Sequence, residues 1–339
     1  MSKRYNIAIV GAMGLVGSEM IRCLERTNIP VGRFRPLDIK ENKGKQVHFN
    51  DAKYDILETK PEYFENIDIA LFAVSTEASL QLAPIAVKKG AIVIDNSSAF
   101  RMDPNCPLVI PEVNPDDIKW HKGIISNPNC STIQMLVVLK PIHDFANIKR
   151  IVVSTYQAVS GSGKLAIDGL IDEAKEFLAN KSIERPLVYK YPIAFNCIPQ
   201  IDIFESDGFT FEEHKMINET KKILHNNGIA VNPTCVRVPV FYGHSESVNI
   251  EMEKKLSRAE VIEILRKAKG VNVVDDIKNE CYPHPFDCID NNLTMVGRIR
   301  EDNTVNNGLN MWIVSNNVRK GAALNAVQIA EFIVNNGLK

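Results

Sequence analysis

The first part of the chain alternates between short apolar runs and segments with a helical pattern. Residues 5–10 form an almost continuous apolar run, residues 11–17 contain three glycines, and residues 18–26 have a helical pattern. An apolar run of this length predicts a strand that is buried on both faces. The chain therefore opens with a predicted strand, turn and helix.

The same alternation continues further along. Apolar runs at residues 67–74 and 91–96 predict two more buried strands, and residues 80–89 predict a helix that ends at Gly90. Strands that alternate with helices form parallel sheets with helices on both faces. We expect an α/β fold whose N-terminal part is a Rossmann-type, doubly wound parallel sheet.

The pattern changes after Asn129. Residues 247–253 alternate strictly between apolar and polar side chains, which predicts a half-buried antiparallel strand. Residues 293–300 and 309–315 predict a further pair of strands. The second part of the chain is therefore predicted to contain an antiparallel sheet.

Two helices complete the second half. Ser257 and Glu260 form a capping box ahead of a helix that reaches about Lys269. Residues 322–334 predict a final helix, which could pack on either domain. The second domain is thus predicted to be α+β, and it should share an interface and a cleft with the first.

Composition and charge narrow the function to small-molecule chemistry. The formal net charge is -1 and the basic residues are scattered, so neither nucleic acid nor an anionic membrane has a concentrated basic surface to bind. No apolar run has the length of a membrane span, and no signal-peptide pattern is present at the start. Seven cysteines without Cys-x-x-Cys spacing argue against a disulfide framework. We expect a cytoplasmic protein.

The glycines of the first turn indicate a dinucleotide site. Gly11, Gly14 and Gly17 stand directly between the first strand and the first helix, where bare backbone can approach a pyrophosphate. A tight turn without a ligand is the alternative. Asp38 follows the second strand, about where a Rossmann acid binds the ribose 2′-hydroxyl of NAD.

Basic residues around Asp38 favour the other form of the cofactor. Arg35, Lys40, Lys43 and Lys45 surround it in the sequence, and cations at this place suit the 2′-phosphate of NADP. Lysines of a solvated loop are the alternative. This stretch therefore leaves the choice between NAD and NADP open.

Cys130 is the candidate nucleophile. It precedes the apolar run at residues 133–139, which Pro141 is expected to stop, so it lies in the first turn of a predicted buried helix. At that place the helix N–H groups and dipole favour the thiolate, the form that attacks a carbonyl carbon. A small buried hydrophobic residue is the alternative, but the position at the start of the helix favours the nucleophile.

Arg237 and His244 are candidates for substrate binding and proton transfer. A predicted strand at residues 236–240 leads into a bend that contains Gly243, which sets the two side chains near each other. Arginine can bind a carboxylate in a bidentate manner, and histidine can move protons. A surface arginine and a structural histidine are the alternative.

Two further segments carry candidate chemistry. A predicted strand at residues 151–156 leads Gln157 into a glycine-containing loop that could lie against a cofactor or a substrate amide. Cys281, His284 and Cys288 have a metal-like spacing, but three ligands in a proline-containing loop favour a chance arrangement. No metal site is expected.

Several segments match the motifs of one enzyme family in the same order. They are G-A-M-G-L-V-G at 11–17, S-N-P-N-C-S-T-I-Q-M at 126–135, S-T-Y-Q-A-V-S-G at 154–161, V-R-V-P-V-F-Y-G-H-S-E-S-V at 236–248, N-E-T-K-K at 218–222 and K-G-A-A-L-N-A-V-Q at 320–328. Together they closely resemble aspartate-semialdehyde dehydrogenase over nearly the whole chain.

This resemblance implies a domain organisation and a reaction. Residues 1–129, joined by the C-terminal helix 321–339, would bind the dinucleotide, and residues 130–320 would form a catalytic and dimerisation domain. The reaction would be NADPH-dependent reduction of L-4-aspartyl phosphate to L-aspartate 4-semialdehyde and phosphate through a cysteine acyl-thioester. It serves lysine (diaminopimelate), threonine, methionine and isoleucine biosynthesis, in a cytoplasmic homodimer with no nucleic-acid or membrane partner.

The resemblance also implies roles for single residues. Cys130 would be the acyl-thioester nucleophile, His244 the acid–base group, and Gln157 would orient the intermediate. The residues implied to bind substrate or phosphate are Arg101, Asn129, Gln157, Glu212, Lys215 and Arg237. Those implied to contact the cofactor are Gly11, Met13, Gly14, Leu15, Val16, Glu41, Asn42, Ser160, Gly161 and Asn317.

The cofactor loop departs from the family. Where many members have S-A-R-S-A-G, with the arginine on the 2′-phosphate, this chain has residues 39–44, and Glu41 replaces the arginine. Lys40 or Lys43 could substitute for it, so NADP stays favoured and NAD remains possible.

Two other functions compete with this one. N-acetyl-glutamyl-phosphate reductase has related chemistry but usually shows G-C-Y-x-T around its cysteine, unlike Asn129-Cys130-Ser131-Thr132. A non-catalytic Rossmann-type cofactor sensor would not need Cys130, Gln157, Arg237 and His244 together.

Overall fold

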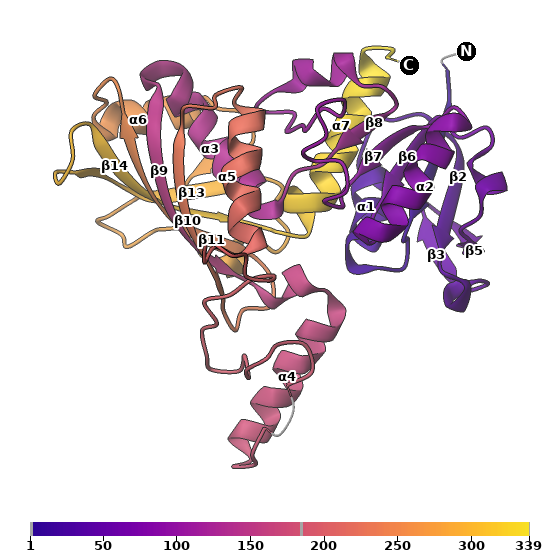
Figure 1. Ribbon diagram of the computed structural model, residues 1–339, viewed down its shortest axis with the longest axis horizontal. Coiled ribbons are helices and arrows are strands. Elements are labelled where there is room, and N and C mark those ends of the chain that lie inside the picture. The colour runs from indigo at the N-terminus through magenta and orange to yellow at the C-terminus, as the bar shows by residue number, and fades with distance from the viewer. Residues whose placement is uncertain (1–2, 184–185, 339) are drawn as a thin grey trace. The chain divides into compact units, whose positions relative to one another are not determined.

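The computed structural model describes residues 3–183 and 186–338. The chain forms two compact units: unit 1 comprises Met1–Asn129 with Ala322–Lys339, and unit 2 comprises Cys130–Gly321 (Figure 1). Within the described residues, no helix combines the length and the apolar character that crossing a membrane requires.

Unit 1 is built on a six-stranded sheet in which every pair of neighbouring strands is parallel. Its strand order is β5-β2-β1-β6-β7-β8. The strands are β1 Tyr5–Val10, β2 Val31–Asp38, β5 Leu57–Glu58, β6 Ile69–Phe72, β7 Ile92–Asp95 and β8 Ile124–Ser126. The predicted doubly wound parallel sheet is confirmed.

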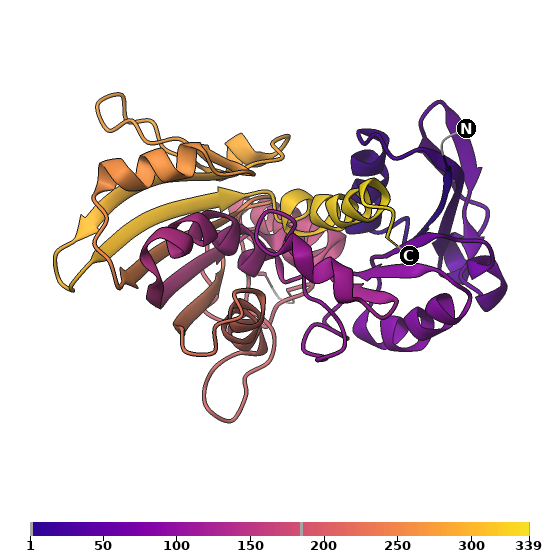
Figure 2. The ribbon, with the colours of Figure 1, turned by 90° about the horizontal axis from the view of Figure 1, so that it is seen from above.

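Helices cover both faces of this sheet (Figures 1 and 2). Helix α1 (Leu15–Glu25) and the last helix, α7 (Leu324–Asn335), contribute to one apolar core, and α2 (Thr76–Lys88) contributes to the other. Strand β1 shows why both cores form, because Ile7 and Ile9 pack in the first and Ala8 and Val10 in the second.

The smaller elements of unit 1 lie in its connections. They are the hairpin of β3 Gln46–Phe49 and β4 Ala52–Asp55, and the short 3-10 helices η1 Lys40–Asn42, η2 Pro61–Phe64 and η3 Pro115–Trp120.

Unit 2 contains a mixed six-stranded sheet with the order β10-β9-β11-β14-β13-β12. The central strands β9, β11, β14 and β13 pair antiparallel, whereas the outer pairs β10–β9 and β12–β13 are parallel. The strands are β9 Ile148–Gln157, β10 Ala230–Arg237, β11 His244–Met252, β12 Val271–Val273, β13 Thr294–Asp302 and β14 Gly308–Ser315. The predicted antiparallel strands and the α+β class are confirmed.

Helix α3 is the central helix of unit 2, since it packs on four strands and on both α5 and α6. The predicted capping box of Ser257 and Glu260 is present at the start of α6. Helix α4 extends away from the sheet (Figure 1). The helices are α3 Cys130–Ala146, α4 Lys164–Leu178, α5 Phe211–Ile223 and α6 Arg258–Arg266, with the short 3-10 helices η4 Val159–Ser162 and η5 Pro285–Cys288. A short π-helix, η6 Arg319–Ala323, precedes α7.

Three helix boundaries were predicted wrongly. Helix α1 begins at Leu15 rather than at residue 18, and α2 begins at Thr76, where the Ser75 hydroxyl caps it, rather than at residue 80. Helix α3 continues through Pro141 to Ala146. A proline costs a helix one hydrogen bond and some steric strain, and the buried side chains along α3 outweigh that cost.

Candidate active site

Cys130 is the first residue of α3, as the sequence predicts. Its side chain is half-buried, whereas the other six cysteines are either buried or exposed. The backbone of Gly321 packs closely on it, because a Cβ atom built at Gly321 would lie 2.8 Å from the Cys130 Cβ. The nucleophile candidate therefore sits at a helix start and against a glycine that leaves room for it.

Two other cysteines of unit 2 are unsuited to nucleophilic attack. Burial, and then the nearby Glu212 carboxylate, raises the pKa of the Cys235 thiol. Burial raises the pKa of Cys288 to about 12. Since only the thiolate attacks a carbonyl carbon, both groups stay inert at neutral pH.

His244 is the first residue of β11 and is fully buried. The Ala158 backbone N–H donates a hydrogen bond of 3.0 Å to its Nδ1, so the proton of the neutral ring is placed on Nε2. Nε2 has no hydrogen-bond partner among the described residues. Burial, and then the Arg237 guanidinium, lowers the pKa of His244 to about 3. The ring is thus a neutral hydrogen-bond donor.

Arg237 ends strand β10 and lies near His244. Its Nη1 donates a 2.7 Å hydrogen bond to the Ala158 carbonyl, and its Cζ lies 5.8 Å from the centre of the Tyr189 ring. Gly161 contacts both side chains, because a Cβ atom built there would lie 2.8 Å from Arg237 Nη1 and 3.3 Å from His244 Cε1. The predicted proximity of Arg237 and His244 is confirmed.

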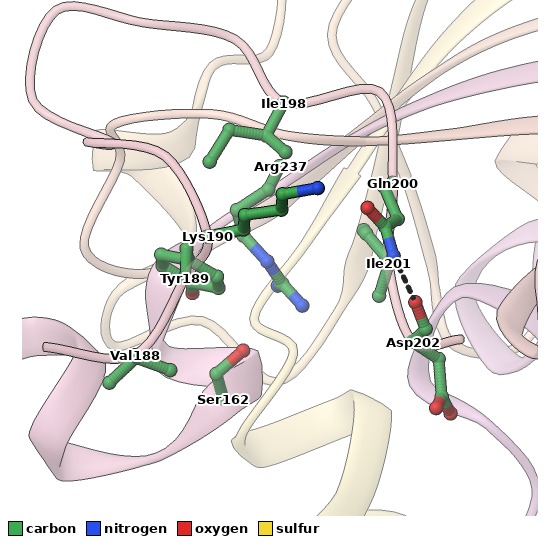
Figure 3. A pocket seen from close by; sticks show the side chains of 9 residues that line it. All are labelled: Ser162, Val188, Tyr189, Lys190, Ile198, Gln200, Ile201, Asp202 and Arg237. Carbon is green, nitrogen blue, oxygen red and sulfur yellow. Dashed lines mark hydrogen bonds between the residues drawn. The ribbon is translucent and has the colours of Figure 1, made fainter. Parts of the chain in front are cut away.

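A pocket of about 280 Å³ opens beside Arg237. Figure 3 shows the guanidinium reaching into it between the side chains of Tyr189 and Ile201. The lining residues are Ser162, Val188, Tyr189, Lys190, Ile198, Gln200, Ile201, Asp202 and Arg237. A planar cation in such a pocket can bind a carboxylate through two parallel hydrogen bonds.

Gln157, Glu212 and Lys215 form a connected polar chain. Gln157, the last residue of β9, donates a 3.1 Å hydrogen bond to one Glu212 oxygen, and Lys215 Nζ lies 3.2 Å from the other. Lys215 also pairs with Asp202 at 3.0 Å. Because Gln157 and Arg237 are paired in register across β9 and β10, the structure brings these predicted substrate residues together.

Two residues expected at the cofactor, Ser160 and Asn317, are buried and bonded to each other. Asn317 Nδ2 lies 3.0 Å from the Ser160 hydroxyl, and its Oδ1 accepts a 3.0 Å hydrogen bond from the Gly243 N–H. These bonds hold the loop of Gly161 against the bend that precedes His244. Ser160 and Asn317 therefore position the loop whose Gly161 contacts Arg237 and His244.

The glycine-rich turn of unit 1 fits a pyrophosphate. Gly11 has φ +82°, and a Cβ atom at Gly17 would lie 2.0 Å from the Gly11 carbonyl oxygen, so larger residues are excluded. No side chain of the described residues caps the start of α1 at Leu15. The N–H groups of a first helical turn, here those of Leu15, Val16 and Gly17, have no partner within the helix, and they are suited to hold an anion.

Arg101 and Asn129 also belong to unit 1 and are buried. Arg101 Nη2 donates a 2.7 Å hydrogen bond to the Asn96 carbonyl. The segment before it is held by Asp95, whose carboxylate accepts hydrogen bonds from the Ser97 N–H at 3.1 Å and hydroxyl at 2.7 Å. Burial raises the pKa of Asp95, and the Ser97 hydrogen bonds oppose that rise.

Glu246 is a buried residue of β11 that the sequence did not single out. Its side chain is fully buried, and neither oxygen has a hydrogen-bond partner of normal geometry among the described residues. Burial raises its pKa well above the usual value, and the nearby Gln134 side chain opposes that rise. It lies two residues after His244 on β11, in phase with the apolar residues Val248 and Ile250. A charged residue in phase with apolar positions was the signal that could have found it.

The segment with metal-like spacing holds no ligand cluster. Within the described residues no group of three His, Cys, Asp or Glu side chains is arranged to hold a metal ion. Cys288 is buried and Cys281 is exposed. A Cβ atom at Gly243 would lie 2.5 Å from the Cys288 sulfur, so Cys288 packs behind the bend that leads to His244.

Comparisons with known proteins show the family of the chain. Residues 6–121 match the family model "Semialdehyde dehydrogenase, NAD binding domain", and residues 139–320 match "Semialdehyde dehydrogenase, dimerisation domain". The class that the fold and site define is therefore that of the semialdehyde dehydrogenases, enzymes with a nicotinamide-dinucleotide-binding domain.

Full-length relatives narrow the class. Aspartate-semialdehyde dehydrogenases of Aquifex aeolicus and Bacillus subtilis are 50% and 48% identical to the chain, covering 98% of it and 99% and 98% of the relatives. The crystal structure of aspartate semialdehyde dehydrogenase II of Vibrio cholerae, complexed with ASA, has a TM-score of 0.96 at 44% identity, covering 99% of each chain. The chain belongs to the aspartate-semialdehyde dehydrogenase family.

Proposed function

We propose that this chain reduces L-4-aspartyl phosphate to L-aspartate 4-semialdehyde and phosphate. The observation that carries the proposal is the cluster at the ends of β9, β10 and β11, where Gln157, Arg237 and a neutral, donor-bearing His244 meet. Family membership supports the same reaction. The product would enter lysine, threonine, methionine and isoleucine biosynthesis in the cytoplasm.

The first step would form a thioester on Cys130. The thiolate attacks the acyl carbon, the bond from that carbon to the phosphate oxygen breaks, and phosphate leaves with the electron pair. Arg237 would hold the substrate carboxylate in a bidentate manner. Lys215 and Arg101 would bind the phosphate, and Asn129 and Glu212 would organise the pocket.

In the second step His244 would stabilise negative charge. A bound nicotinamide dinucleotide supplies the hydride. As the thioester carbonyl is reduced, its oxygen becomes an oxyanion, and the Nε2–H of His244 donates a hydrogen bond to it. The oxyanion then reforms the carbonyl and expels the Cys130 thiolate, which releases the aldehyde. Gln157 would orient the thioester for this step.

The neutral state of His244 is what makes this donor available. Because Nδ1 accepts the Ala158 N–H, the ring proton stays at Nε2 through the neutral pH range. In the reverse direction the Cys130 thiolate would add to the aldehyde carbon, and the same Nε2–H would donate a hydrogen bond to the oxyanion that forms, until the hydride leaves. The acid–base role that the family resemblance implies would consist of sharing this Nε2 proton with that oxygen.

The family resemblance assigns the cofactor contacts. In the turn after β1 they are Gly11, Met13, Gly14, Leu15 and Val16, with the pyrophosphate at the start of α1. It also assigns cofactor contacts to Glu41, Asn42, Ser160, Gly161 and Asn317. The family resemblance favours NADP, whereas the position of Asp38 favours NAD as a second candidate.

A homodimer is the expected assembly. Residues 139–320 match a dimerisation domain, and the mass of the protein in solution measures the assembly directly. A monomeric mass would contradict this part of the proposal.

The reaction is tested by phosphate-dependent reduction of NADP, and separately of NAD, with aspartate semialdehyde. We expect Cys130→Ala to abolish turnover. The matched control is Cys197→Ala, which removes an exposed thiol and should keep full activity. An active Cys130→Ala variant would refute the nucleophile.

The same assay separates the rival functions. Activity with the semialdehyde of N-acetylglutamate in place of aspartate semialdehyde would favour the related reductase. Inactivity with both substrates and both cofactors would favour a cofactor sensor.

A further inference from the structure

The acid at the end of β2 is fixed beside the glycine-rich turn. Asp38 Oδ2 accepts a 2.7 Å hydrogen bond from the Met13 N–H, and the carbonyl of Leu37 accepts hydrogen bonds from the N–H groups of Gly11 and Ala12 at 2.9 and 3.1 Å. In Rossmann-type domains the adenosine ribose of the dinucleotide lies at this place. Asp38 is therefore held where it would meet the ribose.

The Asp38 carboxylate has one acceptor position that no donor occupies. Oδ1 accepts hydrogen bonds from the Ile39 N–H at 2.8 Å and from Asn42 Nδ2 at 2.9 Å, so three donors reach Asp38 in all. A carboxylate has roughly four acceptor positions, which leaves one on Oδ2. All three donors are neutral, and no described residue forms an ion pair with Asp38.

These properties suit a hydroxyl group and not a phosphate. The 2′-hydroxyl of NAD can donate a hydrogen bond to Oδ2. The 2′-phosphate of NADP offers acceptor oxygens and carries negative charge, so it would lose that bond and be repelled by the carboxylate. NAD and NADP differ only at this 2′ position, so its contact with Asp38 bears directly on the choice between them.

The nearby cations do not offset the carboxylate. Arg35 Nη1 donates to the backbone carbonyl oxygens of Tyr63 and Glu65. Lys45 Nζ donates a 2.7 Å hydrogen bond to Asn42.

Lys40 and Lys43 are exposed, and the exposed carboxylate of Glu41 lies between them in sequence. Exposed lysines are solvated and screened, and they contribute little compared with a buried, fixed charge. Asp38 is 6% exposed.

We infer that Asp38 makes this enzyme prefer NAD to NADP, through a hydrogen bond to the ribose 2′-hydroxyl and repulsion of the 2′-phosphate. The inference rests on the proposed function, because it assumes that the turn after β1 binds a nicotinamide dinucleotide. It departs from the NADP use that the family resemblance favours.

The test measures the direct binding of NADH and of NADPH to the enzyme in the absence of substrate. Nicotinamide fluorescence at constant ionic strength reports the binding. We expect NADH to bind about tenfold more tightly, the ratio that one hydrogen bond to a charged group corresponds to. Asp38→Asn keeps the size of the side chain and removes the charge, and it should raise the NADPH affinity relative to NADH by about the same factor.

Asp51→Asn is the matched comparison, since it removes an exposed carboxylate of the same unit that has no assigned contact with the cofactor. It should change the ratio of the two affinities much less than Asp38→Asn does. Thermal unfolding checks that each variant is folded, and the preference of the unchanged enzyme decides the matter even if Asp38→Asn is unstable.

Tighter binding of NADPH by the unchanged enzyme would overturn the inference, and so would an equal effect of Asp51→Asn and Asp38→Asn. Either result leaves the proposed function intact if one cofactor supports turnover with aspartate semialdehyde. Binding without any turnover would instead refute the proposed function, and failure of both cofactors to bind would refute both proposals.

Discussion

A single methyl group added at Gly161 should weaken substrate binding. In Gly161→Ala the new Cβ would lie 2.8 Å from Arg237 Nη1 and 3.3 and 3.4 Å from His244 Cε1 and Nε2. The backbone at Gly161 has no positive φ, so alanine itself is tolerated there and the strain falls on the neighbouring side chains. Arg237 must move away from the loop.

The size of the effect follows from the hydrogen bonds that position Arg237. Its Nη1 is held by the Ala158 carbonyl at 2.7 Å, and a shift of about half an ångström, roughly what a normal contact requires, would stretch this bond to the long end of the normal range and displace the guanidinium. Hydrogen bonds that involve a charged group contribute about 1.5 to 3 kcal/mol. If the guanidinium can no longer hold the substrate carboxylate, kcat/KM should fall by about 10- to 100-fold, mostly through KM.

Steady-state kinetics with aspartate semialdehyde would measure this effect. Gly163→Ala is the matched control, because a Cβ atom there meets nothing within 4 Å but the backbone has φ +87°. That variant should lose about 1 to 2 kcal/mol of stability and keep its KM, whereas Gly161→Ala should raise KM. A kcat/KM of Gly161→Ala within about twofold of the unchanged enzyme would refute the reasoning.

Three further predictions concern buried groups of unit 2. Gly321→Ala places a Cβ atom 2.8 Å from the Cys130 Cβ, so kcat and the rate of Cys130 alkylation by iodoacetamide should both fall about tenfold or more; unchanged alkylation would contradict this. His244 is neutral in the folded protein, so below its unfolded pKa of 6.5 the unfolded chain binds more protons than the folded one. The free energy of unfolding therefore decreases as the pH is lowered. Between pH 7.5 and 5 the unchanged enzyme should lose about 2 kcal/mol more than His244→Gln in urea unfolding, and equal losses would sink the argument. The pKa of Glu246 is raised above its usual 4.5, so the stability of the folded state falls as the pH rises above 4.5. In thermal unfolding, Glu246→Gln should therefore be more stable than the unchanged enzyme at pH 8 but not at pH 4.

Much of the fold was predictable because its signals are local. The apolar run that became β1 and the Ser257–Glu260 capping box describe interactions within a few residues, and such interactions do not depend on the rest of the chain. The start of α3 at Cys130 followed from the same kind of signal. Motif order along the chain then indicated the family, because residue types needed for one chemistry recur at fixed places.

Tertiary structure decided what depends on distant neighbours. Pro141 was expected to end α3, but packing of the helix on the sheet and on two other helices outweighs the local cost. The tautomer of His244 depends on the N–H of Ala158, and the confinement of Arg237 depends on Gly161. These pairs are far apart in sequence, and no local pattern records them.

Asp38 shows most clearly what the sequence determines and what only the tertiary structure decides. The sequence by itself determined that an acid follows the second strand with basic residues around it, which left both cofactors open. Only the structure shows that the carboxylate is buried and bonded by three neutral donors, while Arg35 points to the carbonyl of Glu65. The sequence lists charges, but their effect depends on burial and on partners, and those exist only once the chain has folded.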